Sequence, residues 1–269
     1  RYVNEDDFVA QRRMLEPFQE TEMDKQIAKD TSIFRVYDPS EIGGGGRTAY
    51  FHQSIWGYHA AKPAGIQNLF DFHISKNNVK VLSMLNVKYI VQQDEEGRNY
   101  PAINPDANGN AWFINELVPV YNANDEIMAL KTLDVKHKAV FDISKFADIK
   151  ELNYTTDSTT AIKLVEYKPN HLTYSSDNSN PGIAVFSEMY YPHGWNAYID
   201  GKLKQHFEVN YVLRALEIPA GNHKIEFKFE PTLIQVGGRI TMASSIVLVL
   251  VILFGIGHAY RKSRKKSTA

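Results

Sequence analysis

The longest apolar run in the chain is Ile240–Ala259, near the C-terminal end. Its twenty residues include no Asp, Glu, Lys or Arg. A helix of this length spans about 30 Å, which is the thickness of the hydrocarbon core of a bilayer. Core helices of soluble proteins rarely run this far without a charge. The pattern therefore predicts one transmembrane helix over residues 239–260.

A strongly basic segment follows the span, with five cations between Arg261 and Lys266. Basic clusters beside a span are retained in the cytoplasm, which predicts a cytoplasmic tail over residues 261–269 and places residues 1–238 outside. The chain starts at Arg1 without an apolar leader. A C-terminal span alone does not carry a preceding domain across a membrane, so we expect this to be the C-terminal piece of a longer membrane protein.

Short helical and strand-like patterns alternate over residues 1–150, which predicts an α/β subdomain. Acids in a first turn indicate helix starts at Asp6–Val9, at Thr21–Asp24 and after a cap at Asn124. Strand patterns occupy Ser32–Tyr37, Val87–Val91, Ala111–Tyr121 and Ala139–Asp142, short helices are predicted at Asn77–Leu85 and Ser144–Ala147, and Asp94–Gly109 has the polar composition of a loop.

From Glu151 the pattern changes to regularly spaced strands separated by turns, which predicts an antiparallel β-sandwich of immunoglobulin-like or jelly-roll-like type over residues 151–235. The Asp200-Gly201 pair favours a tight hairpin turn. The predicted strands are Lys163–Tyr167, Leu172–Ser175, Gly182–Ser187, Trp195–Ile199, Tyr211–Ile218 and His223–Phe229. The expected fold class is therefore α+β, with one transmembrane helix after the sandwich.

Charge and composition exclude some classes of partner and of metal site. Residues 1–238 carry 24 basic and 31 acidic side chains, a net charge of −7, which argues against a nucleic-acid binder. The chain has no cysteine, so neither a disulfide nor a thiolate metal site is available. We find no cofactor motif and predict no metal site and no cofactor.

Two stretches carry a family resemblance. One is Thr48–Lys62 (TAYFHQSIWGYHAAK), followed by Val81–Ile90; the other is Ser187–Lys202 (SEMYYPHGWNAYIDGK), followed by Asn210–Arg214 (NYVLR) and Ile218–His223. In this order, and with the terminal span, they resemble the C-terminal region of YfhO-family bacterial membrane proteins of the Bacteroidetes type. The chain departs from the family after Lys62, where Pro63–Gly65 replaces an expected Leu and basic residues.

The resemblance implies an extracytoplasmic domain attached to a many-helix body in the bacterial inner membrane. Proteins of this family resemble glycosyltransferases that use lipid-linked sugars in the cell envelope. Their catalytic carboxylate lies on an early loop of the helical body, so the resemblance assigns no catalytic residue to this chain. The expected partners are the bilayer, the rest of the protein and a lipid-linked sugar or glycan.

The densest polar and aromatic cluster consists of His52, Trp56, Tyr58, His59 and Lys62. Its aromatic rings would stack on a sugar, and its lysine would pair with a phosphate. The alternative is structural, with the rings in the core and the histidines bonded to backbone groups. A metal site built on His52 and His59 would need a third ligand such as His73.

The second cluster is Tyr190, Tyr191 and Trp195, in the segment YYPHGW. It could form a carbohydrate platform, an aromatic patch near lipid headgroups, or a loop that closes the sandwich with Trp195 buried.

Three functions remain open. The chain could be the non-catalytic extracytoplasmic domain and last span of a membrane glycosyltransferase. It could be a membrane-anchored structural or carbohydrate-binding module without transferase activity. It could also hold a hydrolase site, which would require a hydrogen bond between His52 or His59 and a carboxylate in a cleft.

Overall fold

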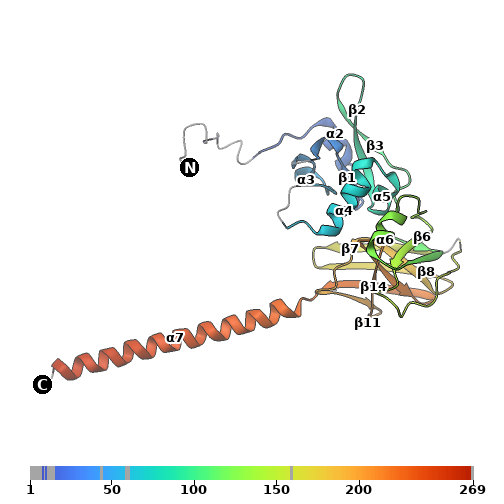
Figure 1. The fold of residues 1–269 in the computed structure, drawn as a ribbon. Coiled ribbons are helices and arrows are strands. Elements are labelled where there is room, and N and C mark those ends of the chain that lie inside the picture. Colours follow the sequence, from blue (N-terminus) through green and yellow to red (C-terminus); the bar gives the residue numbers. More distant parts are fainter. Residues whose placement is uncertain are drawn as a thin grey trace.

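The computed structural model describes residues 8, 10, 16–42, 45–57, 61–157 and 160–267, with side chains up to residue 258. Figure 1 shows a body of short helices and sheets and one long helix that runs away from it. The helix predicted to start at Asp6 and the residues Tyr58 and His59 lie outside the described residues.

The helices of the described residues are short except for the last. They are α2 (Glu22–Ala28), α3 (Arg47–Phe51), α4 (Ala64–Phe72), α5 (Val79–Met84), α6 (Ala123–Ala129) and α7 (Thr232–Ser267), with single 3-10 turns η2 (Pro39–Glu41) and η3 (Ile74–Lys76). The strands of the first half are β1 (Arg35–Tyr37), β2 (Val87–Gln93), β3 (Asn99–Ile103), β4 (Ala111–Ile114), β5 (Glu116–Val120) and β6 (Lys138–Asp142). Those of the second half are β7 (Ala161–Lys168), β8 (His171–Asn178), β9 (Gly182–Met189), β10 (Trp195–Ile199), β11 (Lys202–Lys204), β12 (Phe207–Val209), β13 (Leu213–Ile218) and β14 (Gly221–Phe229).

These strands form four sheets, and the predicted α+β class is confirmed. A three-stranded sheet β1-β2-β3 and a two-stranded parallel sheet β5-β6 belong to the first half of the chain. The other two sheets are antiparallel: a five-stranded sheet in the order β11-β10-β14-β8-β7 and a four-stranded sheet in the order β12-β13-β9-β4.

The five-stranded and four-stranded sheets pack face to face as a sandwich. Phe186 of β9 lies 4.8 Å, between ring centroids, from both Tyr174 of β8 and Phe227 of β14. All three rings are fully buried. Because side chains alternate across a strand, every second residue of these strands enters this inter-sheet core.

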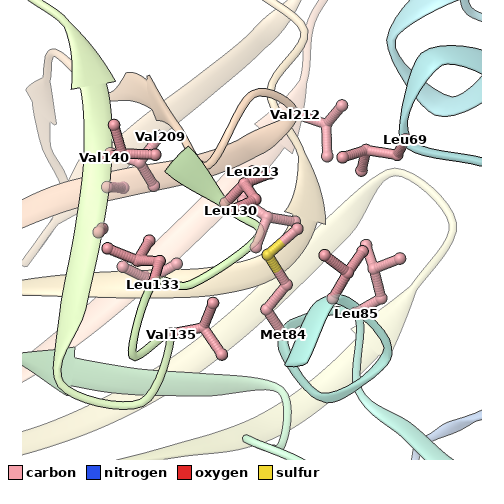
Figure 2. Packing of buried hydrophobic residues seen from close by; sticks show 14 of the residues in the cluster. Leu69, Met84, Leu85, Leu130, Leu133, Val135, Val140, Val209, Val212 and Leu213 are labelled. Carbon is pink, nitrogen blue, oxygen red and sulfur yellow. The ribbon is translucent and has the colours of Figure 1, made fainter. Parts of the chain in front are cut away.

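The four-stranded sheet is also covered on its other face. Ile183 and Val185 of β9 and Leu213 and Ala215 of β13 point away from the inter-sheet core and pack against the short helices in a second, larger core. Figure 2 shows this second core, in which Leu69 of α4 faces Val212, the residue just before β13. The sheet is therefore a central layer buried on both sides.

The predicted boundary at residue 150 needs a correction. Strand β4, which precedes it, pairs with β9 from Ala111 opposite Phe186 to Ile114 opposite Ile183. One sheet is thus continuous across the boundary, and the sandwich is not built from residues 151–235 alone. The local pattern changes near Glu151, but local periodicity does not show which strands pair.

Local signals placed several elements correctly. Thr21 caps α2 through a reciprocal hydrogen-bond pair with Asp24. Asp200 and Gly201 both have positive φ, 50° and 76°, and connect β10 to β11 as the tight turn that their sequence predicted.

Other predictions of local structure were wrong. Asn122, rather than Asn124, caps α6, because its side chain accepts the backbone N–H of Asp125. The helix predicted at Ser144–Ala147 is a turn, in which Asp142 accepts hydrogen bonds from the backbone and hydroxyl of Ser144. The predicted loop Asp94–Gly109 contains β3, which forms a hairpin with β2.

The predicted span lies within α7. Residues Thr232–His258 are long and apolar enough to cross a membrane, and the span is not buried inside the structure. The hydroxyls of Thr241, Ser244 and Ser245 each donate to the carbonyl four residues earlier, at 2.9–3.0 Å. These polar groups therefore need no water, as a lipid environment requires.

Candidate ligand-binding site

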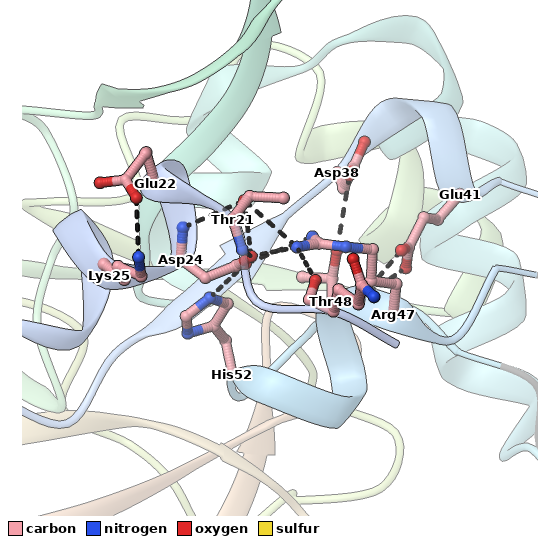
Figure 3. Close-up of polar contacts among 10 residues, drawn as sticks. Thr21, Glu22, Asp24, Lys25, Asp38, Glu41, Arg47, Thr48 and His52 are labelled. Atoms are coloured by element: carbon pink, nitrogen blue, oxygen red, sulfur yellow. Dashed lines mark hydrogen bonds and ion pairs between the residues drawn. The ribbon is translucent and has the colours of Figure 1, made fainter. Parts of the chain in front are cut away.

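His52 belongs to a buried polar network around Asp24, shown in Figure 3. The carboxylate of Asp24 contacts His52 Nε2 at 3.0 Å and forms an ion pair with Arg47, while the hydroxyl of Thr21 donates to it at 2.6 Å. Burial alone would raise the pKa of Asp24, but the hydrogen bonds from Arg47, Thr21 and His52 outweigh it and lower the pKa to about 2. The network fastens α3 to the start of α2.

This contact meets one requirement of the hydrolase hypothesis. A His–carboxylate hydrogen bond is present, and His52 lines a cavity of about 200 Å³ together with Ser32. The hydroxyl of Ser32, however, donates to Asp30 at 2.6 Å, and the carboxylate of Asp24 is already neutralised by Arg47. A serine activated by histidine would need the histidine as its acceptor, so the geometry favours a structural role for His52.

Trp56 and Lys62 form a pair beside the second core. The ammonium of Lys62 lies 3.4 Å from the centroid of the Trp56 ring, and this ring also contacts Phe70 of α4, at 4.0 Å between centroids. Both residues are half-buried. The lysine is therefore held by a cation–π contact at the edge of the core, as a partly exposed positive charge.

His73, the third ligand considered for a metal, is committed to the fold. Its Nε2 lies 2.7 Å from the carbonyl oxygen of Ile127, and its Nδ1 lies 3.2 Å from the amide nitrogen of Asn78. Both ring nitrogens thus bridge the segments around α4, α5 and α6.

The second predicted cluster divides into a packed part and an exposed part. Tyr190 contacts the rings of Phe146 and His206 at 5.9 and 5.1 Å, whereas Tyr191 is 49% exposed. Trp195 is half-buried and contacts Phe229. The cluster is therefore a loop that closes one end of the sandwich and leaves a single tyrosine outside.

Sequence reasoning missed the buried cation that fixes this loop. Arg214 is 3% exposed and lies between the rings of Trp195 and Phe227, 4.7 and 4.9 Å from their centroids. Its Nη2 and Nε donate to the carbonyl of Met189 at 2.7 and 3.1 Å. Burial, opposed by Glu188 nearby, lowers the pKa of Arg214. The available sequence signal for this buried cation was the position of Arg214 in the predicted strand Tyr211–Ile218, between two apolar residues.

Two further buried polar residues hold the turn before β13. Asn210 and Tyr211 adopt left-handed backbone conformations, with φ of 51° and 72°. Glu126 of α6 accepts the backbone N–H of Tyr211 at 3.0 Å, and Asn210 accepts that of Val140 at 3.0 Å. Burial raises the pKa of Glu126 to about 7.

This turn also joins the two predicted clusters. Lys62 leads into α4, where a Cβ on Gly65 would lie 3.0 Å from Val212 and the amide of Asn68 donates to the Tyr211 hydroxyl at 2.7 Å. On the other side, the backbone N–H of Tyr190 donates to the carbonyl of Val212 at 2.7 Å. Segments about 130 residues apart therefore meet at residues 210–212.

The structure also shows a basic cavity that the sequence did not suggest. It has a volume of about 590 Å³ and lies between η3, α5 and α6. It is lined by Phe72, His73, Lys76, Asn77, Asn78, Val79, Lys80, Met128 and Lys131. The i, i+4 spacing of Lys76 and Lys80 was the available signal, although such pairs are common on solvated helix surfaces.

Residues 121–241 match the family model described as bacterial membrane protein YfhO. This part of the chain belongs to the YfhO family. The match begins just before α6, includes the whole β7–β14 region and ends within α7. It covers the Ser187–Lys202 stretch of the resemblance and not Thr48–Lys62. No curated protein and no solved structure matches the chain.

Proposed function

We propose that this chain is the non-catalytic extracytoplasmic domain and terminal span of a membrane glycosyltransferase that uses a lipid-linked sugar. The observation that carries the proposal is the junction between β14 and α7. Only Glu230 and Pro231 separate the last strand of the YfhO domain from α7, whose residues Thr232–His258 are long and apolar enough to span a membrane and are not buried. A connector this short keeps the sandwich at the membrane surface.

The arrangement of the body supports a role near a membrane cavity. In Figure 1, α2 and α3 lie on the side of the body toward which α7 runs. The Asp24 network and the segment that leads to Lys62 start from these helices. Lys62 would then present a positive charge, held over Trp56, toward the lipid surface, where the phosphate of a lipid-linked donor lies.

The chain does not carry the transfer chemistry in this proposal. Transfer from a lipid-linked donor needs a carboxylate at the membrane surface and cations that stabilise the leaving phosphate. Two described carboxylates near the proposed face are already engaged: Asp24 pairs with Arg47, and Asp30 pairs with Lys88. The catalytic groups are assigned to the remainder of the protein.

Lys62→Ala in the full-length protein tests the contact with the donor. Loss of one charged contact to a phosphate is worth about 1.4 kcal/mol, and we expect transfer to fall about tenfold. Lys228→Ala is the matched control, because Lys228 also lies over an aromatic ring, 5.0 Å from the centroid of Tyr198. Equal activity of the two variants would remove Lys62 from the site.

The purified chain provides the second test. We expect it to release no sugar from a lipid-linked donor under conditions in which the full-length protein does. Turnover by the chain alone would place the catalytic groups within residues 1–269 and refute the assignment. Absence of transfer by the full-length protein as well would favour a surface module without transferase activity.

A further inference from the structure

One end of the sandwich carries both the membrane helix and a set of loops. Strand β9 ends there at Met189 and β14 ends there at Phe229, since Lys228 pairs with His171 at the start of β8. The backbone N–H of Phe229 donates to the carbonyl of Asn170 at 2.9 Å. The β7–β8 turn and the loop of residues 190–194 therefore lie beside the start of α7.

The loop of residues 190–194 is fixed against that start. The backbone N–H of Glu230 donates to the carbonyl of Gly194 at 2.6 Å. Gly194 has φ +126°, and a Cβ there would lie 2.8 Å from the Phe229 ring and 3.2 Å from Pro231. Only glycine allows this close approach. Arg214, bonded to the carbonyl of Met189, holds the other end of the loop.

The exposed side chains of this fixed loop are aromatic. Tyr191 is 49% exposed, and its ring lies 5.4 Å from that of His193, edge to face. Pro192 and His193 are exposed as well. Because the backbone on both sides is anchored, the outward position of Tyr191 is set by the fold.

The position of the loop relative to the bilayer follows from the length of α7. From Pro231 to Arg239 the chain rises about 12 Å along the helix axis. The large apolar side chains in these first turns are exposed, with exposed fractions of 82% for Leu233, 68% for Ile234 and 51% for Val236. A span that starts at Thr232 is longer than the hydrocarbon core, so its first turns enter the headgroup layer.

We propose that the loop of residues 190–194 is an interfacial anchor, with Tyr191 and His193 in the lipid headgroup layer. Tyrosine suits this position, because its ring replaces water on apolar surface while its hydroxyl stays hydrated. The contact does not depend on anionic lipid, because the loop of residues 190–194 contains no Lys or Arg. The anchor fixes the angle between the sandwich and α7. The proposed anchor requires that α7 spans the membrane, as the proposed function does.

Spin labels on single cysteines test the anchor, because the chain has no cysteine of its own. Tyr191→Cys is compared with Tyr121→Cys, at a site 77% exposed, and with Leu248→Cys in the middle of the span. Each variant of the full chain is reconstituted into phosphatidylcholine vesicles, with and without phosphatidylglycerol. Power saturation then measures the accessibility of each label to oxygen and to a water-soluble nickel chelate.

We expect the label at Tyr191 to be several-fold less accessible to the nickel chelate than the label at Tyr121, in both lipid mixtures. The label at Leu248 should be accessible to oxygen and protected from the chelate. An embedded label at Leu248 with equal accessibility at Tyr191 and Tyr121 would overturn the anchor and leave the span in place. A water-exposed label at Leu248 would overturn the span itself.

Discussion

Two buried titratable residues, Glu126 and His206, make the stability of this domain depend on pH in opposite directions. Glu126 is fully buried, and one of its carboxylate oxygens has no hydrogen-bond partner among the described residues. His206 is 7% exposed, and its Nδ1 likewise has none. Burial raises the pKa of Glu126 to about 7, and burial together with Arg214 lowers the pKa of His206 to about 4. In both cases the fold favours the neutral form.

The two residues therefore have opposite pH dependences. For Glu126, the folded state holds the proton more tightly than the unfolded state, so stability falls as pH rises from about 4.5 to 7. For His206, the unfolded state holds the proton more tightly, so stability falls as pH drops from about 6.5 to 4. Each contribution is on the order of 2–3 kcal/mol, and they nearly cancel between pH 4.5 and 6.5.

Removing one residue should expose the contribution of the other. We expect Glu126→Gln to lose stability as pH drops from 6.5 to 4.5, by on the order of 2 kcal/mol, because only His206 then titrates. His206→Gln should gain stability over the same change. Thermal unfolding of the chain in detergent between pH 4.5 and 7 measures both slopes. Parallel profiles for the two variants would show that neither residue is buried as described.

The conformation of Gly194 gives a second prediction at this scale. Gly194→Ala places a methyl group 2.8 Å from Phe229 in a left-handed backbone, whereas at Gly201, with φ +76°, nothing lies within 4 Å of the added Cβ. We expect Gly201→Ala to cost about 1 kcal/mol and Gly194→Ala about 3 kcal/mol, because the second variant adds a clash to the strain. Chemical unfolding compares them, and equal costs would mean that the loop does not pack against the helix junction.

At the scale of elements, the sequence predicted what is local. Alternating strands and turn residues located β7 to β10, β13 and β14, and the twenty-residue apolar run located the span within α7. The features that the sequence did not predict depend on contacts between residues far apart in the chain. The single strand predicted at Ala111–Tyr121 is two strands, β4 and β5. The chain leaves the four-stranded sheet between them, at Asn115, whose backbone N–H donates to the carbonyl of His137. The pairing of β4 with β9 leaves no local pattern.

The candidate site was predicted only in part, for the same reason. Lys62 and Trp56 were predicted from their composition, and the structure brings them together. The residues that position the loops are single polar residues in apolar surroundings, namely Glu126, Asn210 and Arg214. Their partners lie 85, 70 and 25 residues away.

The continuous sheet predicts how the body can be divided. Residues 151–235 without β4 would expose the face of β9 and β13 that carries Ile183, Val185 and Leu213. We expect this fragment to lack a cooperative unfolding transition, because the face is apolar and one strand is missing. Residues 16–235 should unfold cooperatively. Calorimetry of both fragments checks this, and a cooperative transition in the shorter fragment would restore the boundary at residue 150.

At the scale of the whole molecule, the charges on either side of the span predict its orientation in the membrane. The body carries a net charge of −7 over residues 1–238, and the five cations that follow the span predict a cytoplasmic tail. The YfhO match covers β7–β14 and their junction with α7, so the placement of that junction decides where this matched part acts.

The account is tested most directly by measuring on which side of the membrane each part of the chain lies. In the full-length protein, Ser75→Cys places a thiol on the exposed surface of the body, and Ser263→Cys places one in the basic tail. A membrane-impermeant maleimide added to intact spheroplasts should label position 75 and should label position 263 only after lysis. Labelling of position 263 in intact spheroplasts, with position 75 protected, would place the domain in the cytoplasm and contradict the account.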